Sequence, residues 1–269
     1  MDEIQEQQNT FSIVMPTCER PNLTIRAIQS IQGQFYQNWE LIVVEDGSRA
    51  EVKGHIQDYI EKQNDVRIKL IHHDVRMQRL VARNTGIKAA QNDWMCHIDS
   101  DDEYLRTYLN SLNWAINEYP DYDIFHFGAL VCTLRNYRLR ESSEIKELEN
   151  ELGMEKFKSG VINLGSFIYK RKLHDEIGYF PEFGSPYKFS DFAKDEMPEC
   201  LDWYGPKYME GGKELGNPWG DDWYLFYKLT RKHKSKDLPF YTYLHYIRRG
   251  GFLQQDDDKI LNRNNVVIA

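Results

Sequence analysis

The hydrophobic positions in the first half of the chain alternate between two spacings. Short apolar-rich runs, typical of buried strands, lie at 11–15, 39–44, 66–71 and 94–98. Elsewhere, apolar residues recur every three or four positions, which is the spacing of a helix with one buried face. The predicted helices are one with Asn22 as its N-cap, and others over 52–60, 78–91 and 105–116. Strands that alternate with helices in this way predict an α/β fold with a mostly parallel central sheet flanked by helices.

The second half of the chain is less regular. It contains predicted strands at 122–131, 161–169 and 240–247, and a predicted helix at 221–231. The charged segment 138–158 indicates an exposed helix or a mobile excursion, and 181–219 indicates an irregular binding loop or disorder. No internal repeat divides the chain, so we expect one domain over 10–250 and a tail at 251–269.

Composition and charge exclude several classes of protein. The chain has 269 residues, of which 41% are hydrophobic and 28% are charged, as in an ordinary globular protein. Its 42 acidic and 34 basic residues give a net charge of −8, which disfavours a broad electrostatic contact with nucleic acid or an anionic membrane. A local basic groove remains compatible with this balance. The four cysteines form no C-x-x-C pair, so we expect reduced thiols rather than a zinc site or a disulfide framework.

Neither a membrane segment nor an export signal is predicted. No apolar stretch approaches the roughly 20 residues that cross a bilayer. The opening segment 1–10 is polar and acidic, whereas a secretory signal begins with basic residues and continues with apolar ones. We therefore expect a cytoplasmic protein with no transmembrane segment.

Three carboxylates follow the predicted strand at 94–98. Asp99, Asp101 and Asp102 lie just beyond its carboxyl end, where open parallel sheets bind their ligands. Neighbouring carboxylates repel one another unless a cation joins them, and Mn²⁺ or Mg²⁺ can also bind the oxygens of a diphosphate. The alternative is that Asp101 or Asp102 caps a helix that begins near Tyr104.

Other polar positions also have both a functional and a structural interpretation. Asp46 follows the strand at 39–44 within an Asp-Gly pair, so it either binds a base or ribose or serves only the turn. Arg83, on a predicted helix, either clamps a phosphate or orients a carboxylate, or it is an ordinary surface arginine. Asp221 and Asp222 stand where a helix begins, which favours capping when they are taken alone.

The order of these motifs resembles the family 2 glycosyltransferases, which have the GT-A fold. The resemblance rests on FSIVMPTCER at 11–20, Glu-Asp-Gly-Ser at 45–48, ARNTGI at 82–87 and IDSDDE at 98–103. It covers residues 11–120 most strongly and extends to INLGSFIYKRKLHDEIGYFP at 162–181. Farther on, GDDWYL at 220–225 is similar to the family's Glu-Asp motif, with Asp221 in place of Glu.

The resemblance implies a nucleotide-sugar-binding half at 10–104 and an acceptor-binding half at 105–250. On the donor side, it implies that Asp101 is the principal metal ligand and that Asp99 contacts the ribose or the metal. Arg83 would lie near the diphosphate or the acidic cluster, and Asp46 would bind the base. The remaining residues assigned to the donor site are Thr17, Glu19 and Ser100.

On the acceptor side, the resemblance implies that Asp222 is the catalytic base. His245 is a candidate metal ligand and Arg248 a candidate contact of the diphosphate or acceptor, although an isolated histidine is more often structural or exposed. Trp219 and Asp221 are candidate acceptor contacts. Aromatic rings suit sugar faces, but the same rings can anchor a loop to the core.

The implied reaction is an inverting transfer of a hexosyl or N-acetylhexosaminyl group from a nucleotide-diphosphate sugar, UDP being preferred. It would use Mn²⁺ or Mg²⁺, and the acceptor would be a hydroxyl, most often on a glycan. One alternative is a sugar nucleotidyltransferase, but its phosphate loop is Gly-rich and residues 16–20 are not. The other is a non-catalytic sugar-nucleotide-binding protein, which would be expected to lack the metal carboxylates or the base.

Overall fold

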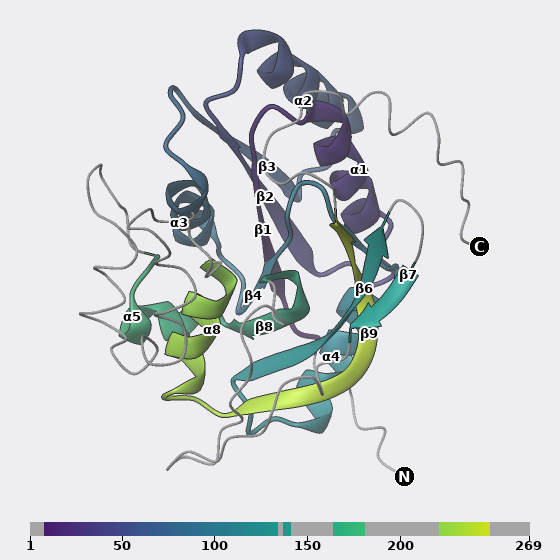
Figure 1. Ribbon diagram of the computed structural model, residues 1–269, viewed down its shortest axis with the longest axis vertical. Helices are drawn as coiled ribbons and strands as arrows, with labels where there is room; N and C mark the ends of the chain where they lie inside the picture. The colour runs from purple at the N-terminus through teal and green to yellow at the C-terminus, as the bar shows by residue number, and fades with distance from the viewer. Residues whose placement is uncertain (1–7, 134–136, 141–163, 181–220, 248–269) are drawn as a thin grey trace, which may run out of the picture.

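The computed structural model describes residues 8–133, 137–140, 164–180 and 221–247, and they form a sheet flanked by helices (Figure 1). The strands are β1 Phe11–Thr17, β2 Trp39–Asp46, β3 Ile68–His73, β4 Trp94–His97, β5 Glu103–Tyr104, β6 Ile124–Thr133, β7 Tyr137–Arg140, β8 Phe167–Lys170 and β9 Ser235–Ile247. The α-helices are α1 Pro21–Gln32, α2 Ala50–Gln63, α3 Arg79–Ala89, α4 Tyr108–Glu118, α5 His174–Ile177 and α8 Asp221–Thr230.

The strand order is β3-β2-β1-β4-β8-β6-β9-β5, with β7 alongside β6. Strands β3, β2, β1 and β4 are parallel, as are β6 and β9, while the other pairings are antiparallel. Phe11 pairs with Trp39 and Thr17 with Glu45, so β1 and β2 end at the same edge of the sheet. Val14 pairs with His97, which brings the residues after β4 to that edge as well. The predicted α/β fold is confirmed.

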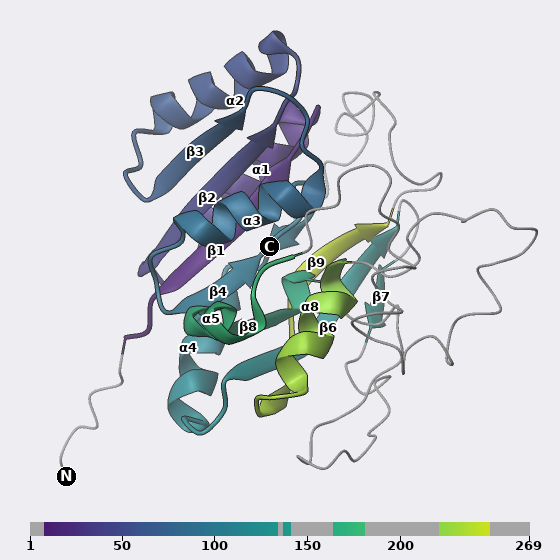
Figure 2. The ribbon, with the colours of Figure 1, turned by 90° about the vertical axis from the view of Figure 1, so that its left-hand side faces the viewer.

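Helices cover both faces of the sheet because alternate strand residues point to opposite sides. On β1, Phe11, Ile13 and Met15 pack with α1 and α4 in one core, whereas Val14 packs with α3 in the other. Helices α5 and α8 lie on the same face as α3, as Figure 2 shows. The two cores thus hold the carboxyl ends of β1, β2 and β4 in a fixed arrangement.

Two predicted helix starts are wrong. Helix α1 begins at Pro21, with Arg20 at the N-cap position, so Asn22 lies inside the first turn. Proline suits the first helical position because its fixed φ is helical and its missing N–H would be unpaired there. Near Tyr104 the chain forms the short strand β5 instead of a helix, and α4 begins only at Tyr108. Neither Asp101 nor Asp102 is therefore a helix cap.

The second half differs from its prediction in two places. Within the strand expected at 161–169, residues 161–163 lie outside the described residues, Leu164–Ser166 form a 3₁₀ turn and the strand begins only at Phe167, in β8. The start of the charged segment forms β7, in which Arg138 and Arg140 alternate with Tyr137 and Leu139, a spacing that suits a strand along β6. The rest of that segment, 181–219 and the tail at 251–269 lie outside the described residues.

The helices that the structure describes include none with the length and hydrophobicity needed to cross a membrane. Cys18 and Cys96 are free thiols, as expected.

Candidate active site

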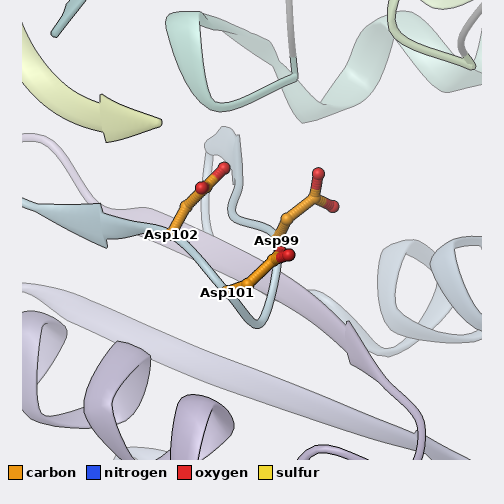
Figure 3. Close-up of side chains that lie close together, drawn as sticks. All are labelled: Asp99, Asp101 and Asp102. Atoms are coloured by element: carbon orange, nitrogen blue, oxygen red, sulfur yellow. The ribbon is translucent and has the colours of Figure 1, made fainter. Parts of the chain in front are cut away.

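The acidic turn, Asp99 to Asp102, directly follows β4 and Ile98 (Figure 3). The backbone N–H of Ile98 donates to the carbonyl of Val14, which fixes the start of the turn against β1. One carboxylate oxygen from each of Asp99, Asp101 and Asp102 lies within 4.8 Å of the others. The side chains of Asp99 and Asp101 are 32% and 20% exposed, whereas that of Asp102 is 1% exposed. Two of the three carboxylates are therefore open to a ligand.

Asp99 is held by the buried Arg83 of α3, whose Nη2 lies 2.8 Å from Asp99 Oδ1. Burial alone would raise the pKa of Asp99, but the positive charges of Arg83 and Arg79 outweigh it and lower that pKa. Arg83 itself is fully buried, so the surface-arginine interpretation is wrong. Arg83 therefore keeps the carboxylate of Asp99 ionised at the sheet edge.

Asp102 is bonded on both oxygens and faces inward. Oδ2 accepts hydrogen bonds from the Tyr243 hydroxyl and from His245 Nδ1, the latter at 3.0 Å, and Oδ1 accepts the Tyr246 backbone N–H at 2.9 Å. Burial raises the pKa of Asp102 to about 6, even though His245 lowers it. Burial works against the charged form of His245, but the bond to Asp102 outweighs it, so the pKa of His245 is raised.

These bonds have a consequence for His245. Because Nδ1 donates to the carboxylate of Asp102, the ring orientation is fixed and Nε2 is left as the nitrogen available to a ligand. Carboxylates that bond the far nitrogen of a histidine in this way commonly orient metal-binding histidines. The structure therefore brings His245, on β9, to the acidic turn.

Gly165 gives Tyr243 its place beside Asp102. A Cβ atom at residue 165 would lie 2.1 Å from the Tyr243 ring, so the ring would have to move. We expect Gly165→Ala to lower the free energy of unfolding by about 1–3 kcal/mol, as overpacking does. Gly54→Ala is the matched control, because Gly54 lies inside α2 with open space around it, and we expect a gain of about 0.5–1 kcal/mol from helix propensity. Urea denaturation checks both, and an unchanged stability of Gly165→Ala would contradict the packing argument.

Thr17 and Glu19 lie at the end of β1 but bond within the chain. The Thr24 hydroxyl donates to the Arg20 carbonyl at 2.7 Å, so the Thr17 hydroxyl donates to Thr24 Oγ1 at 2.6 Å. Glu19 accepts from the backbone N–H and Nε of Arg49, at 2.7 and 2.8 Å. Burial would raise the pKa of Glu19, but the bonds from Arg49 lower it. The Thr17 bond joins β1 to α1, and the Glu19 bonds join the segments that follow β1 and β2.

Asp46, like Thr17 and Glu19, lies at the edge of the sheet where a donor is expected and also bonds within the chain. Its Oδ1 accepts from His73 Nδ1 at 2.9 Å and from the backbone N–H of Met77 at 2.8 Å, and the residue is only 3% exposed. Gly47 has φ +67°, and a Cβ there would lie 2.2 Å from the backbone nitrogen of Arg76. Asp46 and Gly47 thus hold the segment after β3 against the sheet edge, whatever else Asp46 binds.

The structure describes the other predicted site residues only in part. Ser100 is buried within the acidic turn. Asp221 and Asp222 are the first two residues of α8, but their side chains are not among those described. Trp219 and Arg248 lie outside the described residues.

Several residues around the acidic turn were not predicted from the sequence. Arg20 Nη1 lies 3.0 Å from Asp101 Oδ2. Arg26 donates to the Asp101 carbonyl at 2.7 Å, pairs with Glu103 at 2.9 Å and lies over the Tyr246 ring at 4.4 Å. Arg20 follows the β1 motif and could have been found there. The Tyr246 contact arises from long-range strand pairing that local sequence patterns do not reveal.

The acidic turn fits a hard divalent cation. Asp99 and Asp101 each have one oxygen bonded to an arginine, and their other oxygens have no hydrogen-bond partner among the residues that the structure describes. Carboxylate oxygens are the ligands that Mg²⁺ and Mn²⁺ prefer. Asp101 and Asp99 are thus the groups that would hold such an ion, and His245 lies next to them through its bond to Asp102.

Known proteins of similar sequence and structure are glycosyltransferases. The chain is 26% identical over 197 residues to glycosyltransferase GlyG of Streptococcus pneumoniae, a match that covers 68% of this chain and 62% of GlyG. The fold is similar to TarS 1-349 of S. aureus in complex with UDP-GlcNAc, with a TM-score of 0.63 and 19% identity over 90% of this chain and 60% of that one.

A second structural neighbour is the mannosyltransferase PcManGT of Pyrobaculum calidifontis in complex with GDP-Man and Mn²⁺. The TM-score is 0.61 and the identity 15%, over 91% of this chain and 59% of that one. The chain therefore spans about three-fifths of the length of each of these relatives. The likeness confirms the GT-A fold implied by the sequence motifs.

The family comparison agrees with the fold and with the acidic turn at the sheet edge. Residues 12–178, more than half of the chain, match the family described as glycosyl transferase family 2. This range begins at the second residue of β1 and contains the acidic turn and Arg83, on which the resemblance rests. The chain is a transferase that belongs to glycosyl transferase family 2.

Proposed function

We propose that this protein is a cation-dependent, inverting glycosyltransferase that moves a sugar from UDP to a hydroxyl group of a glycan. The observation that carries the proposal is the acidic turn, where Asp99 and Asp101 each present a carboxylate oxygen at the carboxyl ends of β1, β2 and β4. Open α/β sheets bind their ligands at this edge.

The donor assignment is supported by the neighbours and by the location of the donor-site residues. TarS is in complex with UDP-GlcNAc, and PcManGT with GDP-Man and Mn²⁺. Asp46 ends β2 and Glu19 follows β1, at the same edge of the sheet as the acidic turn, which suits a base and ribose bound across these strand ends. We infer a UDP-sugar, with a hexosyl or N-acetylhexosaminyl group.

The donor's diphosphate gains negative charge as its bond to the sugar breaks, and a bound Mn²⁺ or Mg²⁺ supplies the compensating charge. Asp101, Asp99 and His245 hold the ion in this proposal. Arg83 keeps Asp99 ionised, and Asp102 keeps the His245 ring oriented. Arg83 and Asp102 thus contribute indirectly, through the residues to which they bond. The protein's contribution is thus a preorganised set of charges at the leaving group.

The acceptor hydroxyl must lose a proton as it attacks the anomeric carbon. We assign this base to Asp222, the second residue of α8, where the positive end of the helix dipole favours the ionised carboxylate. Attack from the side opposite the diphosphate inverts the anomeric configuration. Trp219, Asp221 and Arg248, close in sequence to α8 or β9, are the proposed acceptor contacts.

A donor screen tests the proposed function. The full chain is incubated with UDP- and GDP-sugars, Mn²⁺ and a mixture of glycan acceptors, and release of nucleoside diphosphate is measured. We expect UDP release that depends on acceptor and is abolished by EDTA. Release of GDP alone would contradict the UDP assignment. In a parallel reaction with added pyrophosphate, conversion of UDP-sugar to UTP and sugar 1-phosphate would indicate a nucleotidyltransferase. No release with any donor would favour a non-catalytic binding protein.

A further inference from the structure

Three arginines bond to the acidic turn in the part of the chain that the structure describes, but they differ in how fully their guanidinium groups are bonded. Arg83 is completely buried against Asp99. Arg26 bonds the Asp101 carbonyl, pairs with Glu103 and stacks on an aromatic ring. Both are thereby committed to the protein's own structure.

Arg20 is different. Its side chain is 27% exposed, and its one side-chain hydrogen bond among the described residues runs from Nη1 to Asp101 Oδ2 at 3.0 Å. A guanidinium has five N–H donors, so most of its donors remain available to an acceptor from solution. The backbone of Arg20 is fixed, because its carbonyl accepts from the Thr24 backbone N–H at 3.0 Å and from the Thr24 hydroxyl at 2.7 Å. Only the side chain has freedom to change partner.

At this location, the charge of Arg20 has opposite effects on the binding of a cation and on the binding of a diphosphate. A cation on Asp101 would share that carboxylate with the Arg20 guanidinium, and like charges at this distance repel. A diphosphate bound to the same cation would bring oxyanions to the exposed side of Arg20, which suits the planar fork of an arginine. Arg20 therefore weakens the binding of the cation alone and strengthens the binding of the cation together with a nucleotide.

We propose that Arg20 exchanges partners during donor binding: it neutralises Asp101 before the donor arrives and then binds the donor's diphosphate. This inference rests on the proposed function and adds a nucleotide-binding residue to it. It also makes the binding of cation and donor mutually dependent, because Arg20 leaves Asp101 most readily when a phosphate replaces that carboxylate.

Arg20→Ala tests the exchange by two binding measurements. Mn²⁺ binding without nucleotide, followed by electron paramagnetic resonance, should become about tenfold tighter because a positive charge beside Asp101 is gone. UDP binding at saturating Mn²⁺, followed by calorimetry, should become about tenfold weaker because a charged hydrogen bond is lost. Uridine, which lacks the diphosphate, should bind the variant and the wild type equally.

Two further variants serve as controls. Arg20→Lys keeps the charge and should restore the wild-type affinity for Mn²⁺. Lys62→Ala removes one positive charge from the last turn of α2 and should change neither affinity. Unchanged or weaker Mn²⁺ binding by Arg20→Ala, or an equal loss of UDP and uridine binding, would overturn the proposal for Arg20. Failure of the wild type to bind UDP with Mn²⁺ would instead overturn the proposed function itself.

Discussion

Asp101→Asn should lower kcat/KM for sugar transfer by about 10²- to 10³-fold, the usual loss when one preorganised electrostatic contact to the leaving group is removed. Asparagine has the same shape, but its neutral side chain binds a divalent cation weakly and no longer pairs with Arg20. The Mn²⁺ concentration that gives half-maximal activity should rise in parallel. Initial rates measured over a Mn²⁺ titration give both quantities.

Asp93→Asn is the matched control for this variant. Asp93 immediately precedes β4, at the end of the strand opposite the acidic turn, and is exposed. The same change of charge there should leave kcat/KM and the Mn²⁺ dependence unaltered. If Asp101→Asn retained wild-type activity and Mn²⁺ dependence, Asp101 would not be the cation ligand.

Asp222→Asn should lower kcat by about 10²- to 10⁴-fold, the usual contribution of a general base. An amide cannot accept the hydroxyl proton, yet it preserves the size of the side chain at the start of α8. The affinity for UDP, measured by calorimetry with Mn²⁺, should remain that of the wild type, because the proposed role of Asp222 is toward the acceptor and not toward the donor.

The neighbouring Asp221→Asn controls for effects on the helix start, since both carboxylates interact similarly with the helix dipole. We expect it to change KM for the acceptor more than kcat. If Asp221→Asn lost turnover and Asp222→Asn did not, the assignment of the base to Asp222 would be wrong.

Much of the fold of residues 11–104 could be predicted from the sequence. The apolar runs that form β1, β2 and β4 are buried on both faces of the sheet. Parallel strands buried in this way are nearly continuous runs of apolar residues, which can be recognised in the sequence. Because these strands end at one edge of the sheet, the acidic turn that follows β4 could be placed at that edge from the sequence. The sequence did not separate the roles of its three aspartates, because only the structure shows Asp102 turned inward and fully bonded.

The rest of the site depends on contacts that no local pattern contains. Asp102 and Tyr243 are 141 positions apart and meet because β9 pairs with β5. Strand β5 has only two residues, too few for any periodicity to be visible. Arg83 looked like an exposed helical residue because its burial results from packing of α3 against β1 and β2, and not from its sequence neighbours.

A crystal structure with Mn²⁺ and UDP, with manganese located by its anomalous scattering, would show directly whether Asp101 binds the cation. We expect an anomalous peak in coordinating contact with a carboxylate oxygen of Asp101, with the diphosphate of UDP on the opposite side of the ion. A peak elsewhere in a UDP-bound crystal, or UDP bound at this edge of the sheet with no manganese beside Asp101, would contradict this expectation.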